Sequence, residues 1–154
     1  MIPGTWESSA RDDPFHPRAN PKSLMLRVSS ALQNKFPVNR ARVYTIPYTA
    51  EFRNPTNLTD RQADYDVSRR QGYLRTAGRI TAVNKHCPLT GFVIMGFSQG
   101  AVIGGDVASN IGNGRGVLEV EDQIRVLGVG LIADGLARRG IPRLVTFQAG
   151  CEIG

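Results

Sequence analysis

The pentapeptide Gly96-Phe97-Ser98-Gln99-Gly100 constrains the fold of this chain more than any other stretch of its sequence. It follows an apolar run at 91–95 and precedes a segment of small and apolar residues at 99–110. In a G-x-S-x-G arrangement the serine occupies a strained turn between a strand and a helix, and a β-carbon at either glycine would collide with its neighbours. We therefore predict a strand buried on both faces, a nucleophile elbow at Ser98 and a packed helix.

Helix and strand patterns alternate along the rest of the chain. Apolar residues at helical spacing predict helices over 23–36, with Leu24, Val28, Leu32 and Phe36 on one face, and over about 65–84. Apolar, β-branched and aromatic residues predict strands over 41–48 and 124–133, and the polar segment 51–64 predicts a surface loop. Because strands alternate with helices, we expect an α/β three-layer sandwich around a central, mostly parallel sheet.

The chain is basic, with 19 Lys and Arg against 13 Asp and Glu and a formal net charge of +6. Its arginines are scattered, and the two adjacent pairs, Arg69-Arg70 and Arg138-Arg139, have no interleaved aromatics. We therefore expect no nucleic-acid partner, but a solvated basic surface open to attraction by an anionic membrane or cell-envelope surface. No apolar run approaches the roughly 20 residues that span a bilayer. Met1-Ile2-Pro3-Gly4 is not a signal peptide, so no export address is expected in this sequence.

Several segments resemble the cutinase family, in the order in which that family carries them. They are Pro3-Gly4-Thr5-Trp6-Glu7-Ser8-Ser9, Val43-Tyr44-Thr45-Ile46-Pro47-Tyr48-Thr49-Ala50, His86-Cys87-Pro88-Leu89-Thr90, Gly96-Phe97-Ser98-Gln99-Gly100-Ala101-Val102-Ile103 and Ile132-Ala133-Asp134-Gly135. The resemblance is closest to actinobacterial cutinase-like envelope lipases. It implies an α/β-hydrolase fold, a serine esterase or lipase that acts on lipid or other small-molecule esters, no cofactor, and a monomer. It also implies a secreted or cell-envelope location.

The resemblance assigns roles to three residues by motif position. Ser98 is the expected nucleophile, and the backbone N–H of Gln99 is one oxyanion donor. Thr5 is the other donor, through its backbone and its hydroxyl. Because the carboxyl ends of parallel strands share one edge of the sheet, this edge is the expected place for the chemistry.

The resemblance also predicts a triad Asp and His after Asp134, but 136–154 contain neither residue type. We expect 1–135 to be an incomplete cutinase-like domain, shortened at both ends, and 136–154 to be a divergent tail that a frameshift or truncation in the source gene explains. His86 precedes the strand that leads to Ser98 and is therefore expected at the opposite sheet edge. His16 is expected on the correct edge, at a position that the family does not use.

Asp106 and Asp134 are further candidates for a partner of Ser98. We expect Asp106 to face solvent or a neighbouring helix and Asp134 to end its strand at the catalytic edge. Without a base, a serine hydroxyl is a poor nucleophile at neutral pH. An inactive homologue that binds lipid, or an unstable pseudogene product, therefore stays open as an alternative to the active ester hydrolase.

The sequence contains two cysteines, Cys87 and Cys151. Cys87 matches a family cysteine whose disulfide partner lies in an amino-terminal segment that this sequence lacks, so we expect an unpaired thiol. Cys151 lies in the divergent tail. Because neither cysteine has a His or carboxylate cluster near it in sequence, no metal site is expected.

Overall fold

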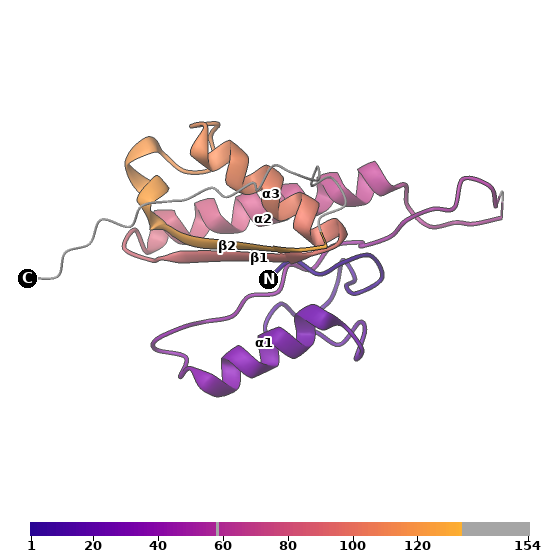
Figure 1. Cartoon of the computed structure of the whole chain (residues 1–154), viewed down its shortest axis with the longest axis horizontal. Helices are drawn as coiled ribbons and strands as arrows, with labels where there is room; N and C mark the ends of the chain where they lie inside the picture. The colour runs from indigo at the N-terminus through magenta and orange to yellow at the C-terminus, as the bar shows by residue number, and fades with distance from the viewer. Residues whose placement is uncertain (58, 134–154) are drawn as a thin grey trace, which may run out of the picture.

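The chain folds into three layers around a parallel pair of strands. The computed structural model describes residues 1–57 and 59–133. Its elements are α1 (Leu24–Lys35), α2 (Tyr65–His86), β1 (Phe92–Phe97), α3 (Gln99–Gly112), the 3₁₀ helix η1 (Val120–Arg125) and β2 (Val126–Ile132). β1 and β2 are parallel, and α1 lies on one face of this sheet while α2 and α3 lie on the other (Figure 1). The predicted α/β three-layer architecture is confirmed.

The amino-terminal residues extend the sheet on the edge of β1 that faces away from β2. Ile2 pairs with Gly96 in parallel, donating to the Met95 carbonyl at 2.7 Å and accepting from the Phe97 amide at 3.2 Å. Met1 in turn forms hydrogen bonds with the 41–48 segment. Its amine donates to the carbonyl of Tyr44 (2.7 Å), and its carbonyl accepts from the amide of Ile46 (2.8 Å).

The prediction of a strand over 41–48 is wrong, since this segment is extended but forms no regular ladder. Within the described residues, its partner at the sheet edge is the short amino-terminal segment, which pairs through Met1. The amide of Thr45 bonds instead to the carbonyl of Pro14 at 2.8 Å, and Pro47 has no amide to donate. Strand-forming residue types were present, but the neighbouring strand that a ladder requires was not.

Burial in two elements also differs from expectation. β1 was predicted to be buried on both faces, but Val93 is 60% exposed while its neighbour Ile94 is 4% exposed. Leu24, Val28, Leu32 and Phe36 were placed on one face of α1, whereas the buried residues of this helix are Met25 and Ser29. Val93 remains accessible because α1 contacts β1 much less than α3 does.

The helices themselves lie close to the predicted ranges. Ser23 caps α1, accepting a hydrogen bond from the Leu26 amide at 3.1 Å. β2 begins two residues later than predicted, because η1 occupies Val120–Arg125. The core forms between the sheet and the α2–α3 layer, and α2 approaches α3 closely at Gly72, where a β-carbon would lie 2.6 Å from Ile103 Cδ1. None of the helices in the described residues has the length and apolarity of a membrane span.

The buried amino terminus makes stability depend on pH. Burial lowers the pKa of the Met1 amine from 8.0 to about 5. The unfolded chain then binds more protons than the folded chain between those two values, so the free energy of unfolding rises from pH 5 to pH 8. The rise is at most about 4 kcal/mol. Urea denaturation across this pH range measures it.

A matched control is the same chain with one glycine added before Met1. The amine then moves outward, and a neutral amide takes its place beside Tyr44. The added residue should therefore flatten the pH dependence. An equal slope in both chains would show that another group causes it.

Candidate active site

Ser98 lies at the turn between β1 and α3, at the carboxyl edge of the sheet. Its backbone angles are φ 51° and ψ −118°, a left-handed conformation that strains a residue with a β-carbon by about 1–3 kcal/mol. The Ser98 amide donates to the Ile132 carbonyl at the end of β2 (2.9 Å), and its carbonyl accepts from the amides of Ala101 and Val102. These bonds hold the strained turn between the strand and the helix and leave the serine half-buried.

The two glycines of the pentapeptide are required by close backbone contacts. A β-carbon on Gly96 would lie 2.1 Å from the carbonyl oxygen of Gly100. A β-carbon on Gly100 would lie 2.1 Å from the oxygen of Ile2 and 2.4 Å from that of Pro3. The start of α3 therefore packs directly on the amino-terminal segment, as the motif predicts for an elbow.

Thr5 belongs to a turn, Gly4 to Glu7, that packs against this elbow. A β-carbon on Gly4 would lie 2.8 Å from the Phe97 ring, and the Glu7 amide closes the turn on the Gly4 carbonyl at 3.0 Å. The Glu7 carboxylate accepts from the amides of Gly4 (2.8 Å) and Leu24 (2.6 Å), which ties the turn to the start of α1. Thr5 is half-buried, and its amide donates no hydrogen bond within the described residues.

Gln99 offers a second free amide, while its side chain has a structural role. The amide of Gln99 has no acceptor in the described part of the chain. The side chain is 1% exposed; its Oε1 accepts from the Ser68 hydroxyl at 3.2 Å and its Nε2 donates to the Glu51 carbonyl at 3.4 Å. Ser68 also accepts from the Glu51 amide at 3.0 Å. This network joins α3, α2 and the segment before the long loop.

Sequence reasoning missed the supporting residues Glu7, Ser68 and Glu51. Each acts on a partner at least 17 positions away along the chain. No local sequence pattern indicates such a contact, because a carboxylate or hydroxyl of this kind is equally compatible with a solvated surface.

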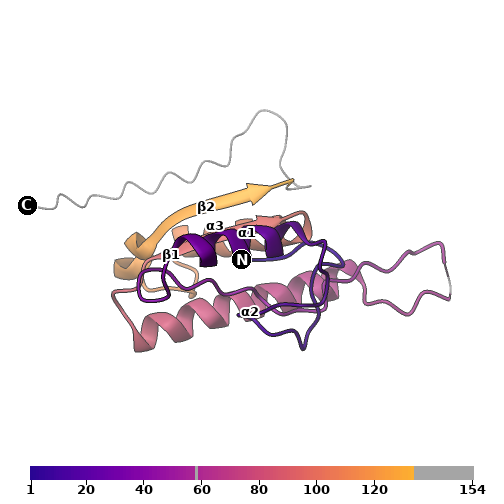
Figure 2. The same ribbon diagram turned by 90° about the horizontal axis from the view of Figure 1, so that it is seen from below.

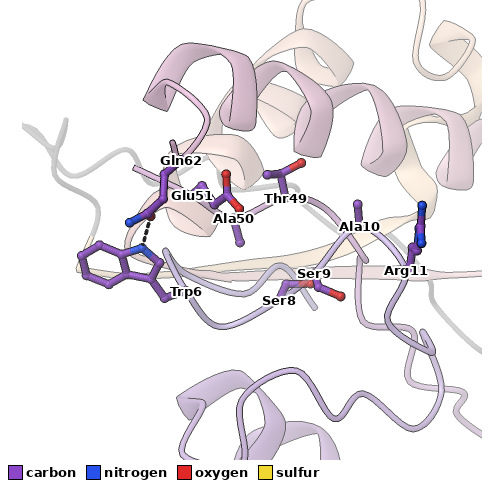
Figure 3. Close-up of a pocket in the computed structure, with 9 residues that line it drawn as sticks. All are labelled: Trp6, Ser8, Ser9, Ala10, Arg11, Thr49, Ala50, Glu51 and Gln62. Carbon is purple, nitrogen blue, oxygen red and sulfur yellow. Dashed lines mark hydrogen bonds between the residues drawn. The ribbon is translucent and has the colours of Figure 1, made fainter. Parts of the chain in front are cut away.

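A pocket of about 500 Å³ lies beside the Gly4–Glu7 turn (Figure 3). Its lining residues are Trp6, Ser8, Ser9, Ala10, Arg11, Thr49, Ala50, Glu51 and Gln62. Trp6 has a left-handed backbone (φ 62°); its amide donates to Ala50 at 2.6 Å and its indole N–H donates to Gln62 at 2.6 Å. Ser98 does not line this pocket, which therefore lies beside the elbow region and is distinct from the nucleophile's own surroundings.

Neither histidine of the chain contacts Ser98 in the described structure. His86 is the last residue of α2, at the end of β1 opposite to Ser98. His16 is exposed, with Nδ1 3.6 Å from the Asp13 carboxylate. Asp106 binds Arg69 through Nη2 (2.6 Å) and Nε (3.0 Å), which raises the pKa of that guanidinium and links α3 to α2. Asp134 lies outside the described residues.

The cysteine and metal predictions concern groups away from the elbow. Cys87 is an exposed free thiol, and Cys151 lies outside the described residues. Across 1–57 and 59–133, no group of three or more His, Cys, Asp or Glu side chains is placed to hold a metal ion. The elbow offers a serine hydroxyl on a strained backbone and two backbone amides, those of Thr5 and Gln99, that have no acceptor within the described residues.

A parallel sheet between helical layers, with a serine at the turn from strand to helix, defines the α/β-hydrolase class. The chain belongs to the cutinase family, whose family model matches residues 16–150. It is 45% identical over 139 residues to the carboxylesterase Culp6 homolog of Corynebacterium glutamicum. That alignment covers 90% of this chain and 43% of the relative, so the chain spans less than half of the relative's length. The division at residue 135 stays a prediction.

Proposed function

We propose that this chain is a serine carboxylic-ester hydrolase of the cutinase type, acting on lipid esters. Ser98 is the nucleophile, and the amides of Thr5 and Gln99 stabilise the oxyanion. The observation that carries the proposal is the left-handed backbone of Ser98 between β1 and α3, with two unpaired amides in the adjoining segments. The name of the Corynebacterium relative, a carboxylesterase, supports ester chemistry.

The proposed reaction proceeds through an acyl-enzyme. A base takes the proton of Ser98 Oγ while the oxygen forms a bond to the ester carbonyl carbon, and the carbonyl oxygen gains negative charge. Hydrogen bonds from the two amides stabilise this charge, and one such donor is worth about 10²- to 10³-fold in rate. The ester C–O bond then breaks, and the alcohol leaves with the proton that the base had taken. Water next attacks the acyl-enzyme with help from the same base, which releases the acid and restores the Ser98 hydroxyl. Since neither histidine lies against Ser98, His16 and His86 are not assigned as the base.

The partners and location are also proposals. The substrate is a lipid or other small-molecule ester, and the protein acts as a monomer at the cell envelope or after secretion. Family membership supports the ester substrate and the location, and the basic net charge of +6 favours contact with anionic surfaces.

Covalent labelling tests the nucleophile directly. The folded chain is incubated with a fluorophosphonate, with and without imidazole as an external base, and the adduct is located by peptide mass spectrometry. We expect one adduct, on the peptide that contains Ser98, formed faster with imidazole and absent from Ser98→Ala. A folded chain that stays unlabelled in imidazole, or an adduct that persists in Ser98→Ala, would reject the proposed role of Ser98.

A further inference from the structure

Arginines and aromatic rings interleave along the sheet edge that faces away from β2. Arg79 on α2 lies over the Tyr44 ring at 4.3 Å, and Arg42 lies over the Phe15 ring at 4.4 Å. The two rings meet edge to face at 5.3 Å. Arg75, one turn before Arg79, donates to the carbonyl oxygens of Ala10 (2.8 Å) and Pro47. Three segments, the loop over 10–15, the extended segment over 41–48 and α2, thus form one surface on the α2 side of the molecule, opposite β2 (Figure 2).

The arginines of this surface are not ion-paired within the described residues, and Glu51 is the one carboxylate among the residues that line the pocket shared by Arg11 and Trp6. Arg11, Arg42, Arg75 and Arg79 are all exposed. The nearby carboxylates bond mainly to backbone: Asp12 accepts from three amides, and Asp13 accepts from those of Phe15 and His16, which lower its pKa. Arg75 and Arg79 also repel each other as like charges four residues apart on a helix.

The guanidinium groups that lie over rings are well suited to phosphate. An arginine held against a ring loses little further freedom when it binds, and its N–H groups can donate to two phosphate oxygens. Arg42 and Arg79 make no side-chain hydrogen bond within the described residues, so their donors remain available.

The same surface continues to an exposed tryptophan. Arg11 lines the 500 Å³ pocket at one end and Trp6 lines it at the other (Figure 3), with Ala10, the acceptor of Arg75, between them. Trp6 is 59% exposed, although its indole N–H is bonded to Gln62. An accessible indole beside cationic side chains is typical of proteins at membrane–water interfaces.

We propose that Trp6, Arg11, Arg42, Arg75 and Arg79, here called the basic face, bind the surface of a membrane rich in anionic phospholipid. The arginines contact lipid phosphates, and Trp6 enters the interfacial layer. The choice of a lipid surface over other polyanions rests on the proposed function. The charge, the positions of the arginines over the rings and the exposed indole are independent of the proposed function.

Trp6 is the only tryptophan of the chain and reports on its own insertion. The Ser98→Ala protein is titrated with phosphatidylglycerol–phosphatidylcholine vesicles and with phosphatidylcholine vesicles, so that lipid turnover plays no part. We expect binding and a blue shift of Trp6 emission only with the anionic vesicles, weakened by salt. Absence of binding would overturn the proposal. If Ser98 of the parent chain nevertheless reacts with fluorophosphonate, the proposed function survives that failure.

A charge-matched pair of variants separates the basic face from net charge. Arg42→Gln with Arg79→Gln should weaken vesicle binding about 25-fold, at roughly fivefold per arginine. Arg27→Gln with Arg115→Gln removes the same charge from exposed positions elsewhere and should have a much smaller effect. Equal losses in both pairs would reject a defined face. Binding to DNA that depends on Arg42 and Arg79, without vesicle binding, would mean that the basic face binds nucleic acid and not a lipid surface.

Discussion

The Gly100→Ala variant is expected to lose more than about 3 kcal/mol of its free energy of unfolding. The added β-carbon would lie 2.1 Å from the carbonyl oxygen of Ile2 and 2.4 Å from that of Pro3. Backbone atoms cannot rotate away as a flexible side chain can, so either α3 or the amino-terminal segment must move. A loss of this size is a large share of the stability of a typical domain. Urea denaturation followed by circular dichroism measures it.

Gly78→Ala is the matched control for this substitution. Gly78 lies inside α2, and no atom lies within 4 Å of the place that its β-carbon would occupy. The alanine should therefore stabilise the protein by about 0.5–1 kcal/mol, because glycine is a poor helix former. Equal stability of Gly100→Ala and the parent chain would mean that the amino-terminal segment does not pack on the elbow. The Thr5 assignment depends on that packing.

Ser98→Gly is expected to lose all fluorophosphonate labelling and yet to be more stable than Ser98→Ala. Both variants lack the hydroxyl, so neither has an atom that the reagent can phosphonylate at this position. They differ in the backbone, because alanine retains the strain of φ 51° and glycine relieves it. The expected difference in the free energy of unfolding is about 1 kcal/mol. Mass spectrometry and urea denaturation of the two variants give both readouts.

The comparison tests whether strain is stored at the proposed nucleophile. If Ser98→Gly were less stable than Ser98→Ala, the greater flexibility of glycine in the unfolded chain would outweigh any relief of strain. Labelling of either variant at the same rate as the parent chain would place the reactive hydroxyl elsewhere. Strain that is kept at the expense of stability is common at functional sites.

The helices were largely predictable, whereas the pairing and burial of extended segments were not. The residue spacing of α1 and α2 and the Ser23 cap of α1 are local features, and the bounds of these helices lie within about two residues of the prediction. The 41–48 segment has strand-forming residues, but its partner at the sheet edge, in the described part of the chain, is the short amino-terminal segment, which pairs through Met1. The exposure of Val93 depends on how far α1 covers the sheet, which the composition of β1 does not reveal.

The arginines show the same limit for charged residues. Along the sequence they are scattered, and the two adjacent pairs have no interleaved aromatics. In the structure Arg42 lies over the Phe15 ring and Arg79 over the Tyr44 ring, and the two rings meet edge to face, because the loop, the extended segment and α2 meet at one edge of the sheet. Charge patterning along a chain therefore underestimates a basic surface that distant segments build together.

The sequence by itself determined the elbow at Ser98 and the family. A glycine on each side of the serine and an apolar run before it are local requirements of one turn, and they are met within a few consecutive residues. Tertiary structure alone decided that Glu7 holds the Thr5 turn against α1 and that Gln99 joins Ser68 and Glu51. It also brought together the residues of the basic face. The physical reason is distance along the chain: these contacts join residues from 17 to 65 positions apart, and only packing of the complete fold brings them together.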